Sequence, residues 1–495
     1  MDSMDLRDAR DTRDARDQRD SMDARRSQDS RDLRDLQDSR GRRRVVISGV
    51  GFITPIGNDY ARVIASLREG RHGFERVEFL GNPNIPVRLA GTVKGFAVDS
   101  MNFRDWKWPA RYDVSRETLR GLAPHGLYAL CAIEQALLDA GLERGAVAHD
   151  DATGLFCASA GSAMMLHGHL KQMDATRGER GNPMGVVSSI CGTLNFNLAA
   201  HFKITGAVCG FVSACASGSH ALGYACDEIR LGRLGRVVVV AAEELNAETL
   251  LPFAAMRALS AQGEPALASR PFDAGRDGFV GAGGAVALVL EDAALAAGRG
   301  GRARAEFAGW GQAADGHSIA VSHPEGRGLE LAMRRALADA GAGADEIDYV
   351  NAHATSTPVG DRAEALALKA VFGAGDSDGA GGVGGAGGAG GDGSVGGAGG
   401  ARGGGGKKQP RVSSTKGLTG HPLSLAGAME AAFCVAAMNE GFMPGNAHLV
   451  NVDPVCAGLD LPRATVAERP RVVLNNSSGF GGSNVCHVIR GAAGE

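Results

Sequence analysis

Cys215 lies among small residues in a segment that could hold a reactive cysteine. The segment "AVCGFVSACASGSHALGYA", residues 207–225, joins an apolar run to a helical pattern whose first turn contains only small residues. The run predicts a buried strand, so Cys215 is expected at a strand-to-helix turn. There the free N–H groups and positive potential of a helix N-terminus favour the thiolate, the reactive form of a cysteine. Taken alone, however, a cysteine is more often a small buried core residue.

Three further segments hold residues that could act with a nucleophile. The segment "YVNAHATSTPVGD" places His353 at the end of a predicted strand, and "SSTKGLTGH" places Lys416 and His421 in a loop before a long apolar helix. The segment "NNSSGFGGSN" contains Gly479 and Phe480, and its glycines let the backbone approach a ligand closely. Each segment taken singly also fits an ordinary strand end or surface loop.

The elements that must position these residues follow an α/β pattern. Apolar runs such as "RVVISGVG", "GRVVVVAAEE" and "GAVALVLED" predict strands covered on both faces, and they alternate with helical stretches such as "HGLYALCAIEQALLDAG". The order "AIEQALLDAG" then "TGLFCASAG" parallels "AMRRALADAG" then "IDYVNAHATS". Two matches in one order predict two similar halves, residues 44–297 and 298–492.

Two segments have compositions that are atypical of a folded core. Residues 1–43 repeat Asp and Arg with little to bury, which predicts a disordered tail, although a charged single helix or a misassigned start codon also fits. Residues 373–408 form a Gly-rich insertion, which is expected to be a flexible surface loop without a catalytic role.

The overall composition excludes several classes of protein. A chain of 495 residues with 44% apolar content can bury a large core, and a formal charge of -4 argues against a nucleic-acid binder. No segment is apolar enough to span a membrane, and the N-terminus lacks the order of a signal peptide. The nine cysteines show no CxxC pair or zinc spacing, which predicts a reducing, cytoplasmic location without a metal site. The eight cysteines other than Cys215 are expected to be packing residues.

The four segments together resemble the β-ketoacyl-acyl carrier protein synthases, condensing enzymes of the thiolase fold. The resemblance runs from Arg44 to Arg490 and includes "RRVVISGVGFITPIGN", "VSACASGSHALG", "SRPFDAGRDGFVGAGGA", "NAHATSTPVGD", "STKGLTGH" and "GFGGSN". It implies an α/β fold of two βαβαβαββ-type halves in a five-layered αβαβα sandwich. Within the family, "GFVGAGGAVALVLED" looks closest to the elongating type-I synthases of dissociated fatty-acid systems.

The resemblance implies a reaction and roles for the residues. Cys215 would take an acyl chain from an acyl carrier protein as a thioester, with the N–H groups of Cys215 and Phe480 as an oxyanion hole. Malonyl-carrier protein would then lose CO2, while His353 and His421 donate hydrogen bonds to its thioester oxygen. The carbanion would attack acyl-Cys215 and release a 3-oxoacyl-carrier protein. No metal or organic cofactor is implied.

Other residues of the implied site support or shape it. Lys416 would orient the histidine pair, and Glu364 would hold Lys416 through a buried ion pair. Gly479 and Phe480 would form a gate that moves when the acyl pocket fills. The residues implied to bind substrate are Thr355, Thr357, Ser478 and Met164.

Ser478 stands where most relatives carry a phenylalanine, which predicts a looser or wider gate. This departure leaves open a condensing subunit of a specialised polyene or polyketide pathway. A non-catalytic partner subunit in a carrier-protein assembly is a further alternative, but such a subunit would lack the Cys–His–His set.

An acidic carrier protein should meet basic residues near the pocket mouth. The candidates are Arg177, Arg180, Lys107 and Arg111, with Arg104 in addition. Scattered surface charges would give the same pattern. The resemblance also implies a homodimer that pairs through a strand next to the nucleophile region, each protomer helping to wall its neighbour's acyl pocket.

Overall fold

The computed structural model describes residues 37–38, 40–373 and 409–492. Most of the predicted tail and insertion therefore lies outside the described residues. The last residues of the predicted tail, by contrast, are tied to the folded body. Arg42 forms ion pairs with Asp38 and Asp339, at 2.6 and 2.7 Å, and Arg43 pairs with Asp292 at 3.0 Å. The first long strand begins directly afterwards.

In the described part of the chain, ten strands form one sheet whose two halves repeat the same strand order. The first half contains β1 (Val45–Ile53), β4 (Thr153–Ala158), β5 (Val208–Phe211), β6 (Arg236–Glu243) and β8 (Gly284–Asp292). The second contains β9 (Ala305–Ala314), β10 (Tyr349–Asn351), β11 (Arg411–Ser413), β12 (Val472–Gly479) and β13 (Ser483–Gly491). From the middle outward the orders are β1-β8-β6-β4-β5 and β9-β13-β12-β10-β11. In sequence terms both read first, fifth, fourth, second and third strand, the mark of a duplicated fold.

The pairing directions repeat as well. In each half the second, third and fourth strands pair in parallel, and the first and fifth pair antiparallel. The halves meet where β1 pairs briefly with β9, at Val46–Glu306 and Ile47–Ala305. A small second sheet contains β2 (Phe74–Arg76), β3 (Leu89–Gly91) and β7 (Gly281–Ala282).

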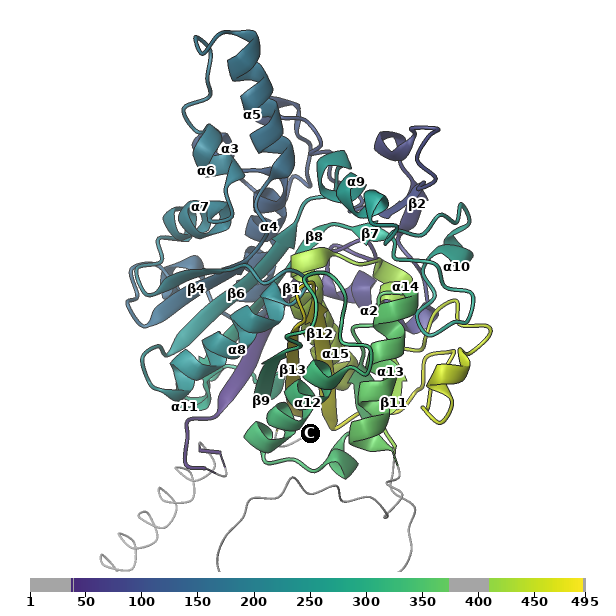
Figure 1. The fold of residues 1–495 in the computed structure, drawn as a ribbon. Helices are drawn as coiled ribbons and strands as arrows, with labels where there is room; N and C mark the ends of the chain where they lie inside the picture. Colours follow the sequence, from purple (N-terminus) through teal and green to yellow (C-terminus); the bar gives the residue numbers. More distant parts are fainter. Residues whose placement is uncertain (1–36, 39, 374–408, 493–495) are drawn as a thin grey trace, which may run out of the picture.

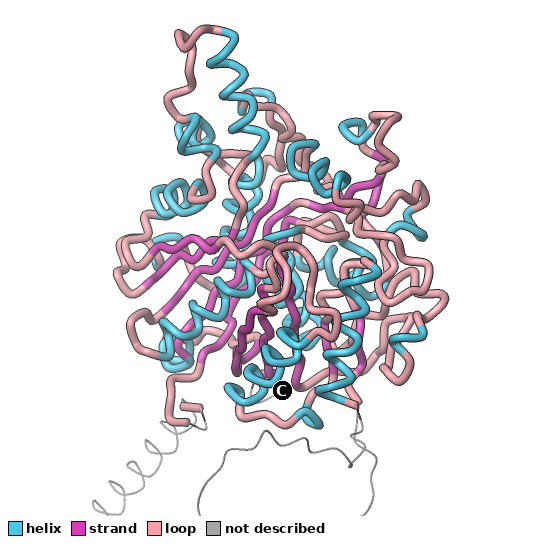
Figure 2. Tube along the Cα trace, in the orientation of Figure 1, coloured by secondary structure: helices cyan, strands magenta, loops and turns pink. Residues whose placement is uncertain are grey.

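Helices cover the sheet in layers (Figures 1 and 2). The longer ones are α2 (Tyr60–Glu69), α4 (Pro124–Asp139), α5 (Ala163–Ala175), α7 (Thr193–Phe202), α8 (Ser217–Arg230), α9 (Ala247–Ala255), α12 (Arg327–Ala340), α13 (Pro358–Phe372) and α15 (Ala426–Glu440). The shorter ones are α3 (Arg116–Gly121), α6 (Gly185–Ser189), α10 (Pro265–Ala268), α11 (Ala293–Gly298) and α14 (Lys416–Thr419). Helix α4 packs on β1, β8 and β6, whereas α12 packs on β9 and β13. Helices α8 and α15 contact strands of both halves, which gives the αβαβα order of layers expected of the thiolase fold.

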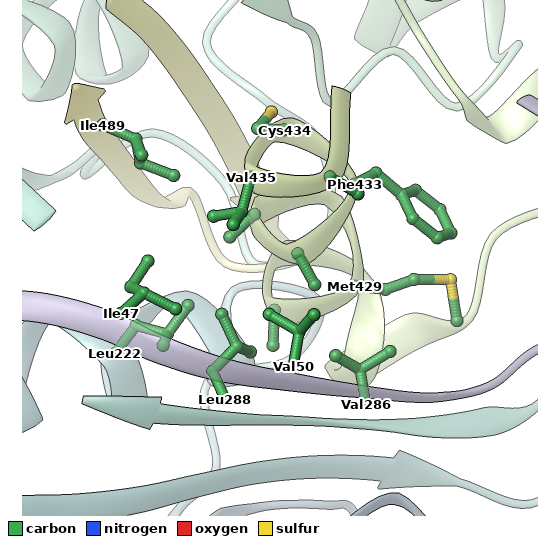
Figure 3. Packing of buried hydrophobic residues seen from close by; sticks show 14 of the residues in the cluster. Ile47, Val50, Leu222, Val286, Leu288, Met429, Phe433, Cys434, Val435 and Ile489 are labelled. Atoms are coloured by element: carbon green, nitrogen blue, oxygen red, sulfur yellow. The ribbon is translucent and has the colours of Figure 1, made fainter. Parts of the chain in front are cut away.

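The middle layer is apolar on all sides. Helix α15 is rich in alanine, and its residues Met429, Phe433 and Val435 belong to the same apolar cluster as Ile47 and Val50 of β1 (Figure 3). A helix that is hydrophobic around its whole circumference belongs in the interior of a large protein. The N-terminal ends of both central helices can therefore be held firmly by the surrounding core.

The two central helices approach closely near their N-terminal ends. A Cβ atom at Gly427 of α15 would collide with the Ser219 hydroxyl of α8, and one at Gly218 of α8 would lie 3.0 Å from the Ala428 side chain. Only glycine permits this approach. The segments that precede α8 and α15 carry Cys215 and His421, so the crossing brings the two segments together.

Several predicted strands and a predicted helix are confirmed, but the exposure of one strand and of two cysteines was predicted wrongly. The predicted strands became β1, β6 and β8, and the predicted helix became α4. Strand β5, which precedes Cys215, was expected to be buried and is instead an exposed edge of the large sheet. The expectation that all other cysteines pack inside was also wrong for Cys191 and Cys209, which are exposed. Among the described residues, no helix combines the length and apolarity needed to cross a membrane.

Candidate active site

Cys215 lies in a tight turn between β5 and α8. Ala214 adopts a left-handed conformation with φ 49°, and the Ser217 hydroxyl closes the turn by accepting from the Ser213 N–H at 2.8 Å and donating to the Ala214 carbonyl at 2.6 Å. The turn places the sulfur just ahead of the helix, as the sequence predicted. Cys215 is 6% exposed and lines a pocket of about 400 Å³.

His421 reaches the cysteine from the second half of the chain. Its Nε2 atom lies 3.0 Å from the Cys215 Sγ atom. Its main chain is fixed to β7 and the preceding residue, because its N–H donates to the Val280 carbonyl at 2.7 Å and its carbonyl accepts from the Ala282 N–H at 3.1 Å. Burial, with a contribution from Lys416, holds the pKa of His421 well below its usual value. The imidazole is therefore neutral near pH 7.

His353 is the second histidine of the pocket, and Lys416 fixes its ring. The His353 ring stands edge-on to the His421 ring, with 5.3 Å between ring centres. The Lys416 Nζ atom lies 3.4 Å from His353 Nδ1. An ammonium group only donates hydrogen bonds, so Nδ1 accepts and the ring proton is on Nε2. Burial, followed by Lys416 and His421, holds the pKa of His353 well below its usual value, so this ring is also neutral.

The ion pair of Lys416 differs from the one that the resemblance implied. Lys416 is fully buried and pairs with Glu430 of α15, not with Glu364. Glu364 instead accepts the N–H groups of His353 and Ala354, at 2.9 and 2.6 Å. The reason is geometric, since Glu364 of α13 lies at the backbone that follows β10, whereas the side chain of Glu430 reaches Lys416 from helix α15 in the central layer. Glu364 thus holds the backbone of the histidine.

The sequence analysis did not identify Glu430, although the sequence contains a signal for it. It is the only acidic residue in the apolar stretch "AGAMEAAFCVAAM". A carboxylate inside a helix that is buried all round needs a charged partner, and Lys416 stands fourteen positions earlier. Burial raises the pKa of Glu430 to about 7 even beside Lys416.

The resting cysteine is a thiol. Burial raises the pKa of the Cys215 thiol to about 12, while Lys416 and the N–H groups of Phe480 and Cys215 act to lower it. The thiolate expected from the helix N-terminus is therefore not the resting form, because the cost of burying the charge is greater than the stabilisation that these groups supply. The Cys215 and Phe480 N–H groups nevertheless act on the sulfur together, which is the arrangement needed for an oxyanion hole.

Gly479 and Phe480 close one side of the pocket. A Cβ atom at Gly479 would lie 2.7 Å from the Ser213 carbonyl, so a side chain there would push the segment away from the cysteine turn. The Phe480 ring is 40% exposed and lies 5.7 Å from the Phe253 ring, measured between ring centres. Phe480 thus lines the pocket of Cys215 while part of the residue remains exposed.

The residues implied to bind substrate are only partly brought together. Thr355, Thr357 and Ser478 line the same pocket as Cys215. Met164, at the start of α5, does not line it and packs with Ala123 and Met165.

The predicted docking residues occupy two parts of the surface. Arg177 and Arg180 are exposed on the connection from α5 to α6, and α5 projects from the top of the molecule in Figure 1. Lys107 bridges to Ala97 in the segment before α3. Arg111 lines a second pocket and donates to the Asn58 carbonyl at 2.9 Å. Arg104 is exposed in that same segment before α3.

Comparisons with known proteins agree with the geometry. The chain matches the family models described as "Beta-ketoacyl synthase, N-terminal domain" over residues 42–296 and "Beta-ketoacyl synthase, C-terminal domain" over residues 304–385 and 395–450. It is 34% identical over 455 residues to the 3-oxoacyl-[acyl-carrier-protein] synthase 1 of Haemophilus influenzae, covering 90% of this chain and 99% of that protein. The Escherichia coli protein of the same name gives the same values, 34%, 90% and 99%.

Solved structures of ketosynthases share the fold. A β-ketoacyl synthase from Burkholderia phymatum superposes with a TM-score of 0.77 at 30% identity, covering 91% of this chain and 99% of that one. The ishigamide ketosynthase/chain length factor gives a TM-score of 0.76 at 26% identity, covering 91% and 100%. The sequence matches over both halves, together with the shared fold, show that the chain belongs to the β-ketoacyl synthase family.

Proposed function

We propose that the protein condenses an acyl-carrier protein with malonyl-carrier protein to give a 3-oxoacyl-carrier protein, CO2 and free carrier protein, in fatty-acid elongation. The observation that carries the proposal is the meeting of Cys215, His353 and His421 in one buried pocket, with 3.0 Å between Cys215 Sγ and His421 Nε2. The relatives named 3-oxoacyl-[acyl-carrier-protein] synthase match across both halves.

In the first step, Cys215 takes the acyl chain. The sulfur attacks the thioester carbonyl, a new C–S bond forms, and the carrier-protein sulfur leaves with the proton that the thiol gives up. The N–H groups of Cys215 and Phe480 receive the negative charge that develops on the carbonyl oxygen. Because burial raises the pKa of the resting thiol to about 12, the sulfur must lose its proton during the attack itself.

In the second step, the histidine pair stabilises an enolate. Loss of CO2 from the malonyl group leaves an electron pair that is shared with the thioester oxygen. Two neutral imidazoles that each donate an Nε2–H to that oxygen stabilise the charge, and Lys416 at His353 Nδ1 supports this tautomer. The carbon then attacks acyl-Cys215, the C–S bond breaks, and the cysteine leaves as a thiolate that takes up one proton from solvent to restore the resting thiol. Lys416 and Glu364 are positioning residues for His353 in this scheme.

The proposed partners are a carrier protein and a second copy of the chain. Arg177 and Arg180 are exposed and carry positive charge suited to an acidic carrier protein. The exposed edge strand β5 is a template for pairing with another strand, and Val208 and Val212 on and beside it are 39% and 62% exposed. Pairing across β5 in a homodimer would cover these side chains.

A condensation assay tests the proposal directly. Purified protein is given malonyl-carrier protein and acyl-carrier proteins graded by chain length and unsaturation, and the product and acyl-enzyme are measured by mass spectrometry. The wild type should form both, and Cys215→Ser should form neither at a measurable rate. If the wild type forms no acyl-enzyme and no 3-oxoacyl product with any primer, the enzyme function is wrong.

The same assay addresses the second candidate, a specialised polyene or polyketide pathway. Ser478 lines the pocket with a small polar side chain, so more space is available beside the gate than an aromatic ring would leave. A strong preference for polyunsaturated over saturated primers would favour that pathway, and the opposite preference would favour fatty-acid elongation.

A further inference from the structure

Glu243 is a buried carboxyl group behind the catalytic pocket that the proposed reaction does not use. It is the last residue of β6 and is fully buried. Its Oε1 atom accepts the Ser424 hydroxyl and the Ala160 N–H, the latter at 3.1 Å. Its Oε2 atom has no hydrogen-bond partner among the described residues. A buried carboxyl group is costly unless it is hydrogen-bonded, so the two contacts of Oε1 are important for this part of the fold.

The hydrogen bond from Ser424 connects Glu243 to the loop that carries His421. Ser424 follows His421 by three residues, and Leu423 between them adopts a left-handed conformation with φ 49°. Leucine disfavours this conformation, which persists only where neighbouring contacts hold it. The hydrogen bond from Ser424 to Glu243 is such a contact, directly after the strained residue. It therefore fixes the turn that presents the imidazole to Cys215.

The hydrogen bond from Ala160 connects Glu243 to the loop before α5. Glu243 holds Ala160, and the adjacent Glu244 accepts the Ser162 hydroxyl at 2.6 Å and the Met164 N–H at 3.3 Å. His125 of α4 faces this pair of carboxyl groups, with its Nδ1 atom 3.7 Å from Glu244. The end of β6 thus joins the loop of His421 to the loop that leads into the projecting helix.

We propose that Glu243 and Ser424 are positioning residues for the condensation, which hold His421 at hydrogen-bonding distance from Cys215 by anchoring its loop to the end of β6. This inference rests on the proposed function for its kinetic test. The carboxylate also acts on the nucleophile electrostatically, since the negative charge of Glu243 raises the pKa of the Cys215 thiol. Positioning and charge can be separated, because glutamine keeps an acceptor oxygen and removes the charge.

Three variants test the pair. Ser424→Ala removes the hydroxyl, Glu243→Gln keeps the acceptor, and Ser66→Ala is the matched control, a buried serine of α2 that donates to the Ile56 carbonyl at 2.7 Å. Ser424→Ala should lower kcat about tenfold with KM for malonyl-carrier protein nearly unchanged, because a misplaced imidazole weakens transition-state contacts. Glu243→Gln should keep kcat within about threefold of wild type for the same reason. Ser66→Ala should keep wild-type kcat.

A second readout does not require turnover. The rate of Cys215 alkylation by iodoacetamide is followed from pH 6 to pH 10, with Cys215→Ser as the blank for the other cysteines. Glu243→Gln should shift this profile to lower pH, because the charge that raises the thiol pKa is gone. Ser424→Ala should also change the profile, since it disturbs the contact between sulfur and imidazole, whereas Ser66→Ala should not.

The outcomes separate the two proposals. If the wild type forms no condensation product, the proposed function is wrong. If the pH profile of Cys215 alkylation nevertheless shifts in both Ser424→Ala and Glu243→Gln, the positioning of His421 by these residues is still supported. An active wild type with an unchanged kcat and profile for Ser424→Ala would overturn the positioning role alone. Equal losses of kcat in Ser424→Ala and Ser66→Ala, tracking equal losses of thermal stability, would also overturn it.

Discussion

The third strand of each half lies at an edge of the large sheet, yet the two edges differ. Strand β11 is covered, because the Val412 N–H donates to the Asp460 carbonyl at 2.8 Å and Val412 is 1% exposed. Strand β5 is open, and Val208 on it is 39% exposed. Both strands lead into a segment with catalytic candidates, Cys215 after β5 and Lys416 with His421 after β11.

This difference shows how the two halves of a duplicated fold can take different roles. In the proposed reaction, the same connection supplies the nucleophile in one half and donor groups in the other. The covered edge strand, β11, is part of the buried interior near Lys416. The open edge strand, β5, is exposed and available to pair with a strand of another chain. In the proposed reaction, the nucleophile for acyl transfer comes from the first half, with one oxyanion donor from Phe480 of the second, and both histidine donors for decarboxylation come from the second half.

The sharpest way to break this division is to disable the second half alone. His353→Ala should lower the condensation rate by about a hundredfold to a thousandfold, because one donor to the developing enolate is lost. Transfer of the acyl chain to Cys215 should fall by less than about tenfold, since its oxyanion donors belong to Cys215 and Phe480. Burst labelling with radioactive acyl-carrier protein measures transfer, and product release measures condensation. Equal losses in both steps would contradict the division.

The covered half should also depend on its buried ion pair for stability. Lys416→Met leaves Glu430 as an unpaired buried carboxyl group and should lower the free energy of unfolding by about 3–5 kcal/mol at pH 8. Urea unfolding followed by circular dichroism measures the loss. The double variant Lys416→Met with Glu430→Gln should recover most of the stability. If it does not, the ion pair is not the cause.

The open edge can be tested by its oligomeric state. Val208→Lys places a charge on β5 and should weaken self-association by about a hundredfold, because two like charges would meet across a symmetric pair of strands. Light scattering after gel filtration gives the mass. Val450→Lys is the control, a substitution at a residue 65% exposed elsewhere on the surface. A monomeric wild type would remove the role assigned to β5.

The smallest expected effect concerns the pH dependence of stability at the end of β6. Burial raises the pKa of Glu243 from 4.5 to about 7, so the folded state binds this proton more tightly than the unfolded state. The stability linked to this carboxyl group is fully present below pH 4.5 and is lost as the pH rises through 7. Relative to Glu243→Gln, the wild type should therefore lose about 1–2 kcal/mol between pH 5 and pH 8 in urea titrations. If the free energy of unfolding changes with pH in the same way in the wild type and in Glu243→Gln, the raised pKa of Glu243 is wrong.

The fold could be predicted from sequence and candidate residues could be named, because both leave local signals, and the candidates Cys215, His353 and His421 line one pocket. Continuous apolar runs mark strands covered on both faces, and small residues around Cys215 mark a strand-to-helix turn. The exposure of β5 left no such signal, since "AVCGFV" is as apolar as a buried strand and only the strand order shows that it lies at an edge.

The partners of charged groups were harder to predict. Both Glu364 and Glu430 are acids on helices that follow loops of the site, and only the three-dimensional arrangement shows which one faces Lys416. The protonation state of Cys215 was missed for a similar reason. A helix N-terminus can be read from sequence, but the burial that outweighs it depends on segments far apart in the chain.

The close crossing of α8 and α15 limits which parts of this enzyme can change without moving Cys215 and His421 apart. Glycine at Gly427 fixes the spacing of two helices that lie inside the core, and that spacing sets the distance between the sulfur and the imidazole ahead of them. The residues around the pocket mouth and on α5 lie outside this crossing. Substitutions there can therefore alter which acyl chains fit while the spacing of the reacting atoms is inherited unchanged.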